Sequence, residues 1–155
     1  MREPELIADQ LRRSFEGEAW HGPAVLEVLS GVTAAQAITR PLENAHSIWE
    51  VVLHIRAWED AVLRRIRGEV VELEGPEDWP AVIDSGDEAW DDTVRSLKLS
   101  NAKLYNGILG MKNERLEETV PGEPYDFYYM LHGVVQHNLY HAGQIAVLKK
   151  GTSGS

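Results

Sequence analysis

Apolar residues recur at intervals of three and four along most of this chain, and the alternation typical of strands is almost absent. This spacing gathers apolar side chains on one face of a helix, so it predicts helices that each bury one side. Four long helices are expected, at residues 3–20, 47–68, 85–112 and 125–149. The pattern therefore predicts an all-α protein.

Residue pairs typical of helix starts support these boundaries. Ser or Thr followed three residues later by Glu or Gln forms a capping box, in which each side chain binds the other residue's backbone N–H. The pattern occurs at Ser47 with Glu50, at Ser85 with Glu88, and at Thr33 with Gln36. The third pair predicts a short extra helical turn after the first helix.

Four long helices without an internal repeat predict a four-helix bundle. We expect a single domain over residues 1–150 and a flexible C-terminal tail over 151–155. The connections that follow the second and third helices contain prolines and are longer than minimal loops. They are therefore compatible with long crossovers as well as with an up-down-up-down order.

Composition excludes several classes of function. The chain has 155 residues, no cysteine and a net charge of −10. Disulfides, thiolate metal sites and a cysteine nucleophile are excluded, and an acidic surface disfavours nucleic acid. No apolar run is long enough to span a membrane, and no secretory signal is recognised. We expect a soluble cytoplasmic protein that binds neither nucleic acid nor membranes.

The negative charge is concentrated between Glu69 and Asp92, where ten acidic residues occur without a lysine or arginine. A hard cation could bind such a run, but the regular spacing of a calcium loop is missing. A solvated linker that leads into an acidic helix start is the favoured interpretation.

Two histidines in the last helix are the main candidates for chemistry. His137 and His141 are four residues apart and so lie on one helix face. Together with Val134, Gln144 and Leu148 they follow steps of three and four, which is the inward seam of a bundle helix. Two imidazoles placed there can bind a metal, or they can be core histidines satisfied by hydrogen bonds.

A third ligand is available in the second long helix. His54 lies between Val51 and Trp58 at the same steps of three and four, so it can also face inward. For the remaining histidines, surface positions or local hydrogen bonds are the favoured roles. These are His21, His46 and His132.

The combination of these motifs resembles the DinB-like family of metal-binding four-helix bundles. The resemblance covers nearly the whole chain and rests on three segments: Ala19-Trp20-His21-Gly22-Pro23, His46-Ser47-Ile48-Trp49-Glu50 leading to His54, and His137-x-x-x-His141-x-x-Gln144 with Tyr140 and Gly143. It implies three histidine metal ligands, which by position are His54, His137 and His141, and it implies a homodimer. One position departs from the family pattern, because Asn138 stands where an acidic residue often follows the first histidine of the pair.

Three neutral histidines leave a divalent metal at least one open position, which is typical of catalytic rather than structural sites. Imidazole ligands suit zinc or nickel, and also iron or copper. Such a metal can activate water for hydrolysis or stabilise a thiolate. The resemblance covers proposed hydrolases as well as transferases that use a low-molecular-weight thiol. Since the chain has no cysteine, any such thiol must come from a cosubstrate.

The sequence does not identify the catalytic side chains. Glu50, Tyr140 and Gln144 are weak candidates, whereas Glu59 and Asp60 are expected to face solvent. The aromatic residues could wall a pocket, although core packing is favoured for them. They are Trp20, Trp49, Trp58 and Tyr140.

The leading hypothesis is therefore a metal-dependent enzyme, a hydrolase or a thiol transferase, that acts on a small molecule. The alternative is a non-catalytic dimeric bundle, in which the histidines hold a structural metal or form a buried hydrogen-bonded network.

Overall fold

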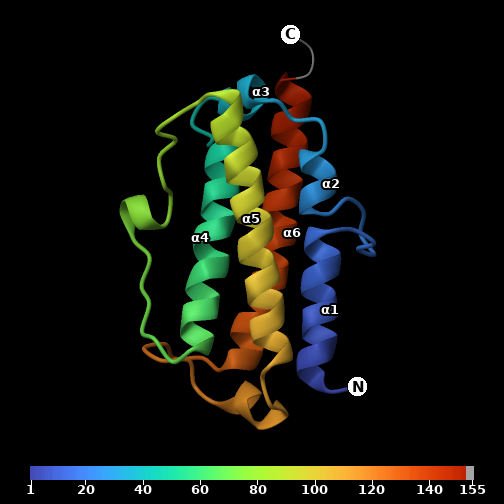
Figure 1. The fold of residues 1–155 in the computed structure, drawn as a ribbon, viewed down its shortest axis with the longest axis vertical. Coiled ribbons are helices and arrows are strands. Elements are labelled where there is room, and N and C mark those ends of the chain that lie inside the picture. The colour runs from blue at the N-terminus through green and yellow to red at the C-terminus, as the bar shows by residue number, and fades with distance from the viewer. Residues whose placement is uncertain (153–155) are drawn as a thin grey trace.

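The computed structural model describes residues 1–152, and four long α-helices run side by side along its length (Figure 1). They are α1 (Glu3–Phe15), α4 (Ile48–Ile66), α5 (Asp87–Leu109) and α6 (Phe127–Thr152). The shorter elements are α2 (Val25–Leu29), α3 (Ala34–Ile38) and the 3-10 turns η1 (Gly75–Glu77) and η2 (Asn113–Glu117). Apart from one isolated bridge, between Thr119 and Asp126, the regular structure of the described residues is helical. The predicted all-α four-helix bundle is confirmed.

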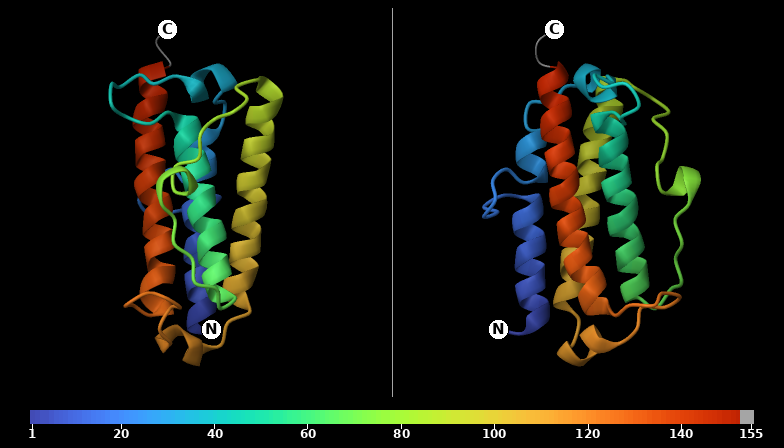
Figure 2. Two further views of the ribbon diagram at one scale, coloured as in Figure 1. Left: turned by 90° about the vertical axis from the view of Figure 1, so that its left-hand side faces the viewer. Right: turned by 180° about the vertical axis from the view of Figure 1, so that it is seen from behind.

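The helices do not follow a simple up-and-down order. In Figure 1, α1 and α6 run upward whereas α4 and α5 both run downward, and α4 packs against α5 and against α6. Parallel neighbours cannot be joined by a short loop. Residues 67–86 therefore return along the outside of the bundle to the start of α5, as both views of Figure 2 show. We call this segment the crossover loop.

The first predicted helix is shorter than expected. It ends at Phe15 rather than Trp20, because the chain turns at Gly17 and Glu18, and Glu18 adopts a positive φ of 66°. The chain then resumes in α2, which stands above α1 in Figure 1 and contacts α6. Together α1 and α2 fill one corner of the bundle, and α3 supplies the predicted extra turn.

Two of the three predicted capping boxes are present. Glu50 N–H donates to Ser47 Oγ over 3.2 Å and Ser47 N–H donates to a Glu50 carboxylate oxygen over 2.6 Å, while Thr33 and Gln36 make the equivalent pair. The prediction for Ser85 was wrong, because α5 begins at Asp87 with Gly86 as its N-cap. At the other end of the chain, Gly151 and Thr152 still belong to α6. The rest of the expected tail, residues 153–155, lies outside the described residues.

We expect the substitution Ser47→Ala to lower the free energy of unfolding by about 1 kcal/mol, because it removes the acceptor for a helix N-terminal N–H group. The matched control is Ser85→Ala, which removes the hydroxyl of an exposed serine that does not cap α5. Urea denaturation followed by circular dichroism measures both. Equal losses in the two variants would contradict the role assigned to Ser47.

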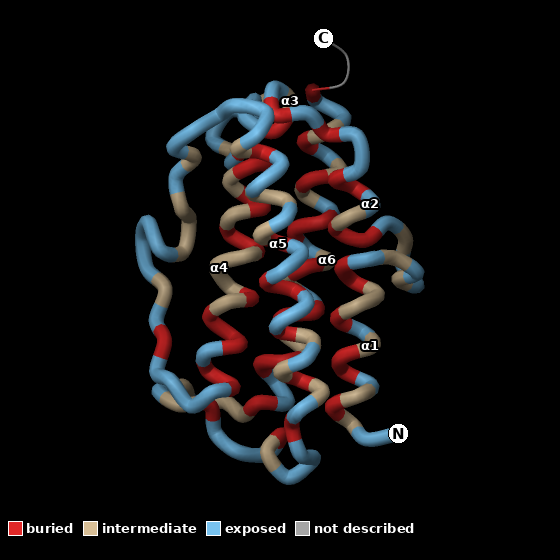
Figure 3. The backbone as a smooth tube through the Cα atoms, in the orientation of Figure 1, coloured by how far each residue is buried: buried red, intermediate tan, exposed pale blue. Residues whose placement is uncertain are grey.

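Buried residues line the inner faces of the long helices (Figure 3) and form two apolar clusters. One cluster lies toward the start of α4 and includes Ile48, Val52 and Leu97; the other, toward the end of α4, includes Leu104 and Leu131. Between them lies a belt of buried polar side chains that we call the polar layer: His54, Glu59, Asn101, Asn138 and His141. Within the described part of the chain, no helix combines the length and apolarity needed to cross a membrane.

Candidate metal centre

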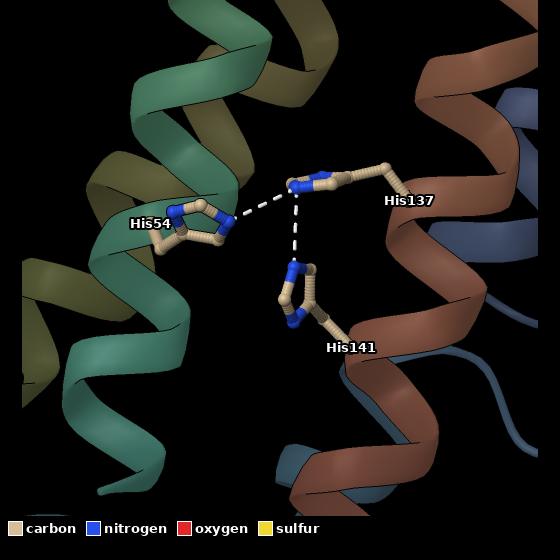
Figure 4. A group of neighbouring side chains, drawn as sticks. All are labelled: His54, His137 and His141. Carbon is tan, nitrogen blue, oxygen red and sulfur yellow. Dashed lines mark hydrogen bonds between the residues drawn. The ribbon is translucent and has the colours of Figure 1, made fainter. Parts of the chain in front are cut away.

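Three histidines meet in and beside the polar layer. His54 comes from α4, and His137 and His141 come from successive turns of α6; Figure 4 shows their rings directed toward one another. His137 Nε2 lies 3.1 Å from His54 Nε2 and 3.1 Å from His141 Nε2. One nitrogen from each ring falls within 4.8 Å of the other two, so the group can hold a metal ion. The structure thus brings together the three histidines that the sequence pattern singles out, and their role as metal ligands stays a prediction.

Hydrogen bonds on the far side of two rings fix where their protons lie. His54 Nδ1 is 2.7 Å from the backbone carbonyl oxygen of Asp78, and His141 Nδ1 is 2.7 Å from Oε1 of Gln144. Both oxygens are acceptors, so each Nδ1 must donate its N–H. In a neutral imidazole the other nitrogen then carries a lone pair. The Nε2 atoms of His54 and His141 therefore turn lone pairs toward His137.

The third ring cannot satisfy both of these lone pairs. A proton on His137 Nε2 points in one direction, so it can make a full hydrogen bond to only one of its two neighbours. His137 Nδ1 is itself buried and has no hydrogen-bond partner among the described residues. A cation at the point where the three Nε2 atoms converge would accept all three lone pairs. The donor set thus fits a metal better than it fits a closed hydrogen-bond network.

The surroundings favour the neutral form of all three rings, which is the form that binds metals. Burial, reinforced by the neighbouring His141 and His54, lowers the pKa of His137 to about 3. Burial also lowers the pKa of His54 and of His141, although their hydrogen bonds to Asp78 and Gln144 oppose the shift. At neutral pH the group is therefore ready to bind a cation without first losing protons.

The crossover loop forms one wall of this centre. Trp79 is stacked between two histidine rings, with centroids 3.8 Å from His54 and 3.7 Å from His46. The carboxylate of Asp78 accepts a hydrogen bond of 2.7 Å from the indole N–H of Trp58. A solvated linker is expected here from the sequence, and the contacts of Asp78 and Trp79 could not be foreseen because no periodicity connects a loop residue to the helix that it covers.

The weak catalytic candidates take different positions. Gln144 is part of the centre through its bond to His141. Tyr140 is largely exposed, and its ring forms a T-shaped contact with that of His141, with centroids 5.1 Å apart. Glu50 is used elsewhere, since it closes the capping box of α4 and pairs with Arg40.

The three tryptophans considered from the sequence differ in how far they are buried. Trp49 is a core residue, as favoured, whereas Trp58 is half-buried with its ring centroid 6.3 Å from that of His137. The expectation for Trp20 was wrong: it is fully exposed, because α1 ends before it.

The expectation that Glu59 faces solvent was also wrong. Glu59 is completely buried in the polar layer, where its Oε1 accepts hydrogen bonds from Asn101 Nδ2 at 2.8 Å and Asn138 Nδ2 at 3.1 Å. Asn138 thus binds Glu59 rather than a histidine ring. Its seam position could have revealed this, because Ile55, Glu59 and Val62 follow the same steps of four and three as the histidines.

We expect the substitution Gln144→Leu to weaken zinc binding by about 10- to 100-fold, because it removes the acceptor that orients His141. Gln136→Leu is the matched control, since Gln136 is exposed on the same helix. Competition with a chromophoric chelator measures both affinities. Similar affinities for the two variants would show that the bond to His141 does not support a metal.

Comparison with known proteins gives a family and a solved structure to which this chain is similar. The solved structure is a crystal structure of a conserved protein from Enterococcus faecalis, with a TM-score of 0.78 and 17% sequence identity over 100% of this chain and 99% of the other. At that identity the likeness concerns the fold alone. No curated protein matches. The family match is to the DinB superfamily and covers residues 19–145, which include all three histidines. The chain therefore belongs to the DinB superfamily.

Proposed function

We propose that this protein is a metal-dependent enzyme that acts on a small molecule through a divalent transition metal held by His54, His137 and His141. The observation that carries the proposal is the convergence of one ring nitrogen from each of the three histidines within 4.8 Å of one another. The hydrogen bonds of His54 and His141 add to it, because they turn unprotonated nitrogens toward the common point. Neutral imidazole ligands favour zinc or nickel, with iron or copper also compatible.

Three protein ligands leave a metal open to substrate. When bound, a metal here would supply Lewis-acid chemistry either to hydrolysis or to transfer from a low-molecular-weight thiol. The chain's own residues position the ligands. Asp78 and Gln144 fix the rings of His54 and His141, and Trp79 covers one face of His54. The thiol would be a cosubstrate, because the chain has no cysteine.

The first test is elemental analysis of the untagged protein by plasma mass spectrometry, followed by titration with zinc and nickel. We expect about one transition metal per chain, none in His141→Ala, and an unchanged content in His46→Ala. His46 is the matched control, because it stacks on Trp79 but lies outside the three-histidine group. Protein that binds neither zinc nor nickel would overturn the proposal and leave a non-catalytic bundle with a buried histidine network.

Chelation of the metal is expected to leave the helices folded. Both apolar clusters are complete without the histidines, whereas a structural metal would contribute folding free energy directly. After treatment with a chelator, the circular dichroism at 222 nm should therefore be retained and the melting temperature should fall by only a few degrees. Unfolding on chelation would instead assign the metal a structural role.

The homodimer and the cytoplasmic location stay predictions. Analytical ultracentrifugation of the metal-loaded protein tests the first, and fractionation of cells that produce it tests the second.

A further inference from the structure

A cavity of about 250 Å³ lies between α4 and α6, directly beside the histidine group. His137 forms part of its wall, and the rest is largely aromatic and aliphatic, with Trp58, Val62, Met130 and Val134 among the lining residues. The cavity is thus adjacent to the proposed metal through one ligand. Its walls carry few polar groups that could be used for binding.

The positive charge in the wall of this cavity is paired with a carboxylate. Of the described lining residues, Arg65 alone carries a full charge at neutral pH. Its guanidinium forms an ion pair of 2.7 Å with Glu123, and it donates to the carbonyl oxygen of Val71 and the hydroxyl of Tyr125. An anionic ligand would have to compete with Glu123 for the same group. The cavity therefore favours an uncharged occupant.

A glycine inside α6 keeps this space open. Gly133 lies one helical turn before His137 and lines the cavity, and a Cβ built on it meets no atom within 4 Å. Glycine in a helix interior destabilises it relative to alanine, so it is usually explained by a close neighbour. Gly107 has such a neighbour, since a Cβ there would lie 2.7 Å from Leu63. Gly133 has none, and the space it leaves belongs to the cavity.

We propose that this cavity binds an uncharged apolar group of the substrate, of the size of a benzyl group, and so places the polar end of that molecule at the histidines. A cavity of about 150 Å³ lined by aliphatic and aromatic side chains accommodates benzene, so 250 Å³ has room for a substituted ring. This inference rests on the proposed function, because it identifies part of the substrate for the same centre.

A second cavity provides an internal comparison. It has a volume of about 580 Å³, lies on the other side of the histidine group along α6, and is lined by residues that include Asn44, Trp79, Gly143 and Gln144. Each cavity therefore has one tryptophan and one glycine in its wall, Trp58 with Gly133 and Trp79 with Gly143. A Cβ at Gly143 also meets no atom within 4 Å, so the two glycines are a matched pair for substitution.

The test is titration of the chelator-treated, metal-free protein with benzyl alcohol, followed by the indole N–H resonances in ¹H–¹⁵N NMR spectra. We expect a saturable shift at Trp58 and none at Trp79. Gly133→Leu should weaken binding at least tenfold, because its side chain fills the cavity, while Gly143→Leu should bind as the wild type does. Leucine has a higher helix propensity than glycine, and the milder Gly133→Ala should weaken binding to a lesser degree.

Benzoate tests the requirement for an uncharged group, and it should bind at least tenfold more weakly than benzyl alcohol. The proposal would be overturned by tighter binding of benzoate, by equal effects of the two leucine variants, or by a shift at Trp79 alone. Because the titration needs no metal, it can succeed in a protein that fails to bind zinc or nickel. Failure of the cavity and failure of the metal centre are therefore distinguishable.

Discussion

Replacing Glu59 with Gln is expected to stabilise the protein at pH 8 by up to about 3 kcal/mol. Burial raises the pKa of Glu59 to about 7, although the hydrogen bonds from Asn101 and Asn138 oppose the shift. In the unfolded chain this carboxyl titrates near 4.5. Between these two values the folded state holds a proton that the unfolded state has released. The stabilisation that protonated Glu59 contributes to the folded state is therefore fully present below pH 4.5, and it is lost as the pH rises through about 7.

The hydrogen-bonding groups around Glu59 also favour its protonated form. Its Oε2 and the Oδ1 of Asn138 are both buried acceptors without a partner among the described residues. A proton on Oε2 turns one of the two acceptors into a donor. The side-chain amide introduced by Glu59→Gln would supply a donor at every pH, so the variant should no longer lose stability as the pH rises.

Chemical denaturation at pH 8 and at pH 4.5 measures the effect of Glu59→Gln. The gain should be largest at pH 8 and should nearly vanish at pH 4.5. Glu72→Gln is the matched control at an exposed site of the crossover loop, where the change should stay within about 0.5 kcal/mol. Loss of stability at pH 8 in Glu59→Gln would contradict the raised pKa of Glu59.

The histidines produce the opposite dependence on pH. In metal-free Glu59→Gln protein, where the contribution of Glu59 is absent, acidification from pH 7 to pH 5 should reduce the free energy of unfolding by at least about 2 kcal/mol. The pKa of His137 is about 3 in the folded state, against 6.5 in the unfolded chain. Between those values the unfolded state binds one more proton. Stability therefore falls as the pH falls, and His54 and His141 add in the same direction.

Denaturation curves between pH 7 and pH 5 check this expectation. Introducing His137→Gln into the same background should reduce the slope of stability against pH by up to one proton equivalent. His21→Ala is the control, because His21 is an exposed histidine in the loop after α1. If both variants kept the parental slope, His137 would not be held in the neutral form by its surroundings.

The positions of the long helices and the inward orientation of the three histidines could be predicted because both follow from the same spacing of three and four residues. Steps of three and four place residues on the inner face of a helix whatever their chemistry, so His54, His137 and His141 could be located before any fold was known. The same spacing includes Glu59, which was nevertheless expected to face solvent. Position on the seam was the better guide at this residue.

The remaining parts of the site depend on contacts that no periodicity encodes. Asp78 and Trp79 reach His54 because the crossover loop, which joins the parallel helices α4 and α5, returns along the outside of the bundle. That path follows from the order in which the helices pack, which helix patterns do not specify. Helix ends were predicted less well for a related reason: a turn such as that at Glu18 depends on local backbone conformation rather than on apolar spacing.

The polar layer also fixes how the helices are aligned along the bundle axis. The apolar clusters above and below it consist mostly of leucine, isoleucine and valine, which could pack in more than one vertical alignment. Sliding α6 past α4 by one turn, about 5.4 Å, would separate Asn138 from Glu59 and press unpaired polar groups against hydrocarbon. Each such group costs about 1–3 kcal/mol. The layer thus selects a single register for the helices, and in that register alone His54 stands level with His137 and His141.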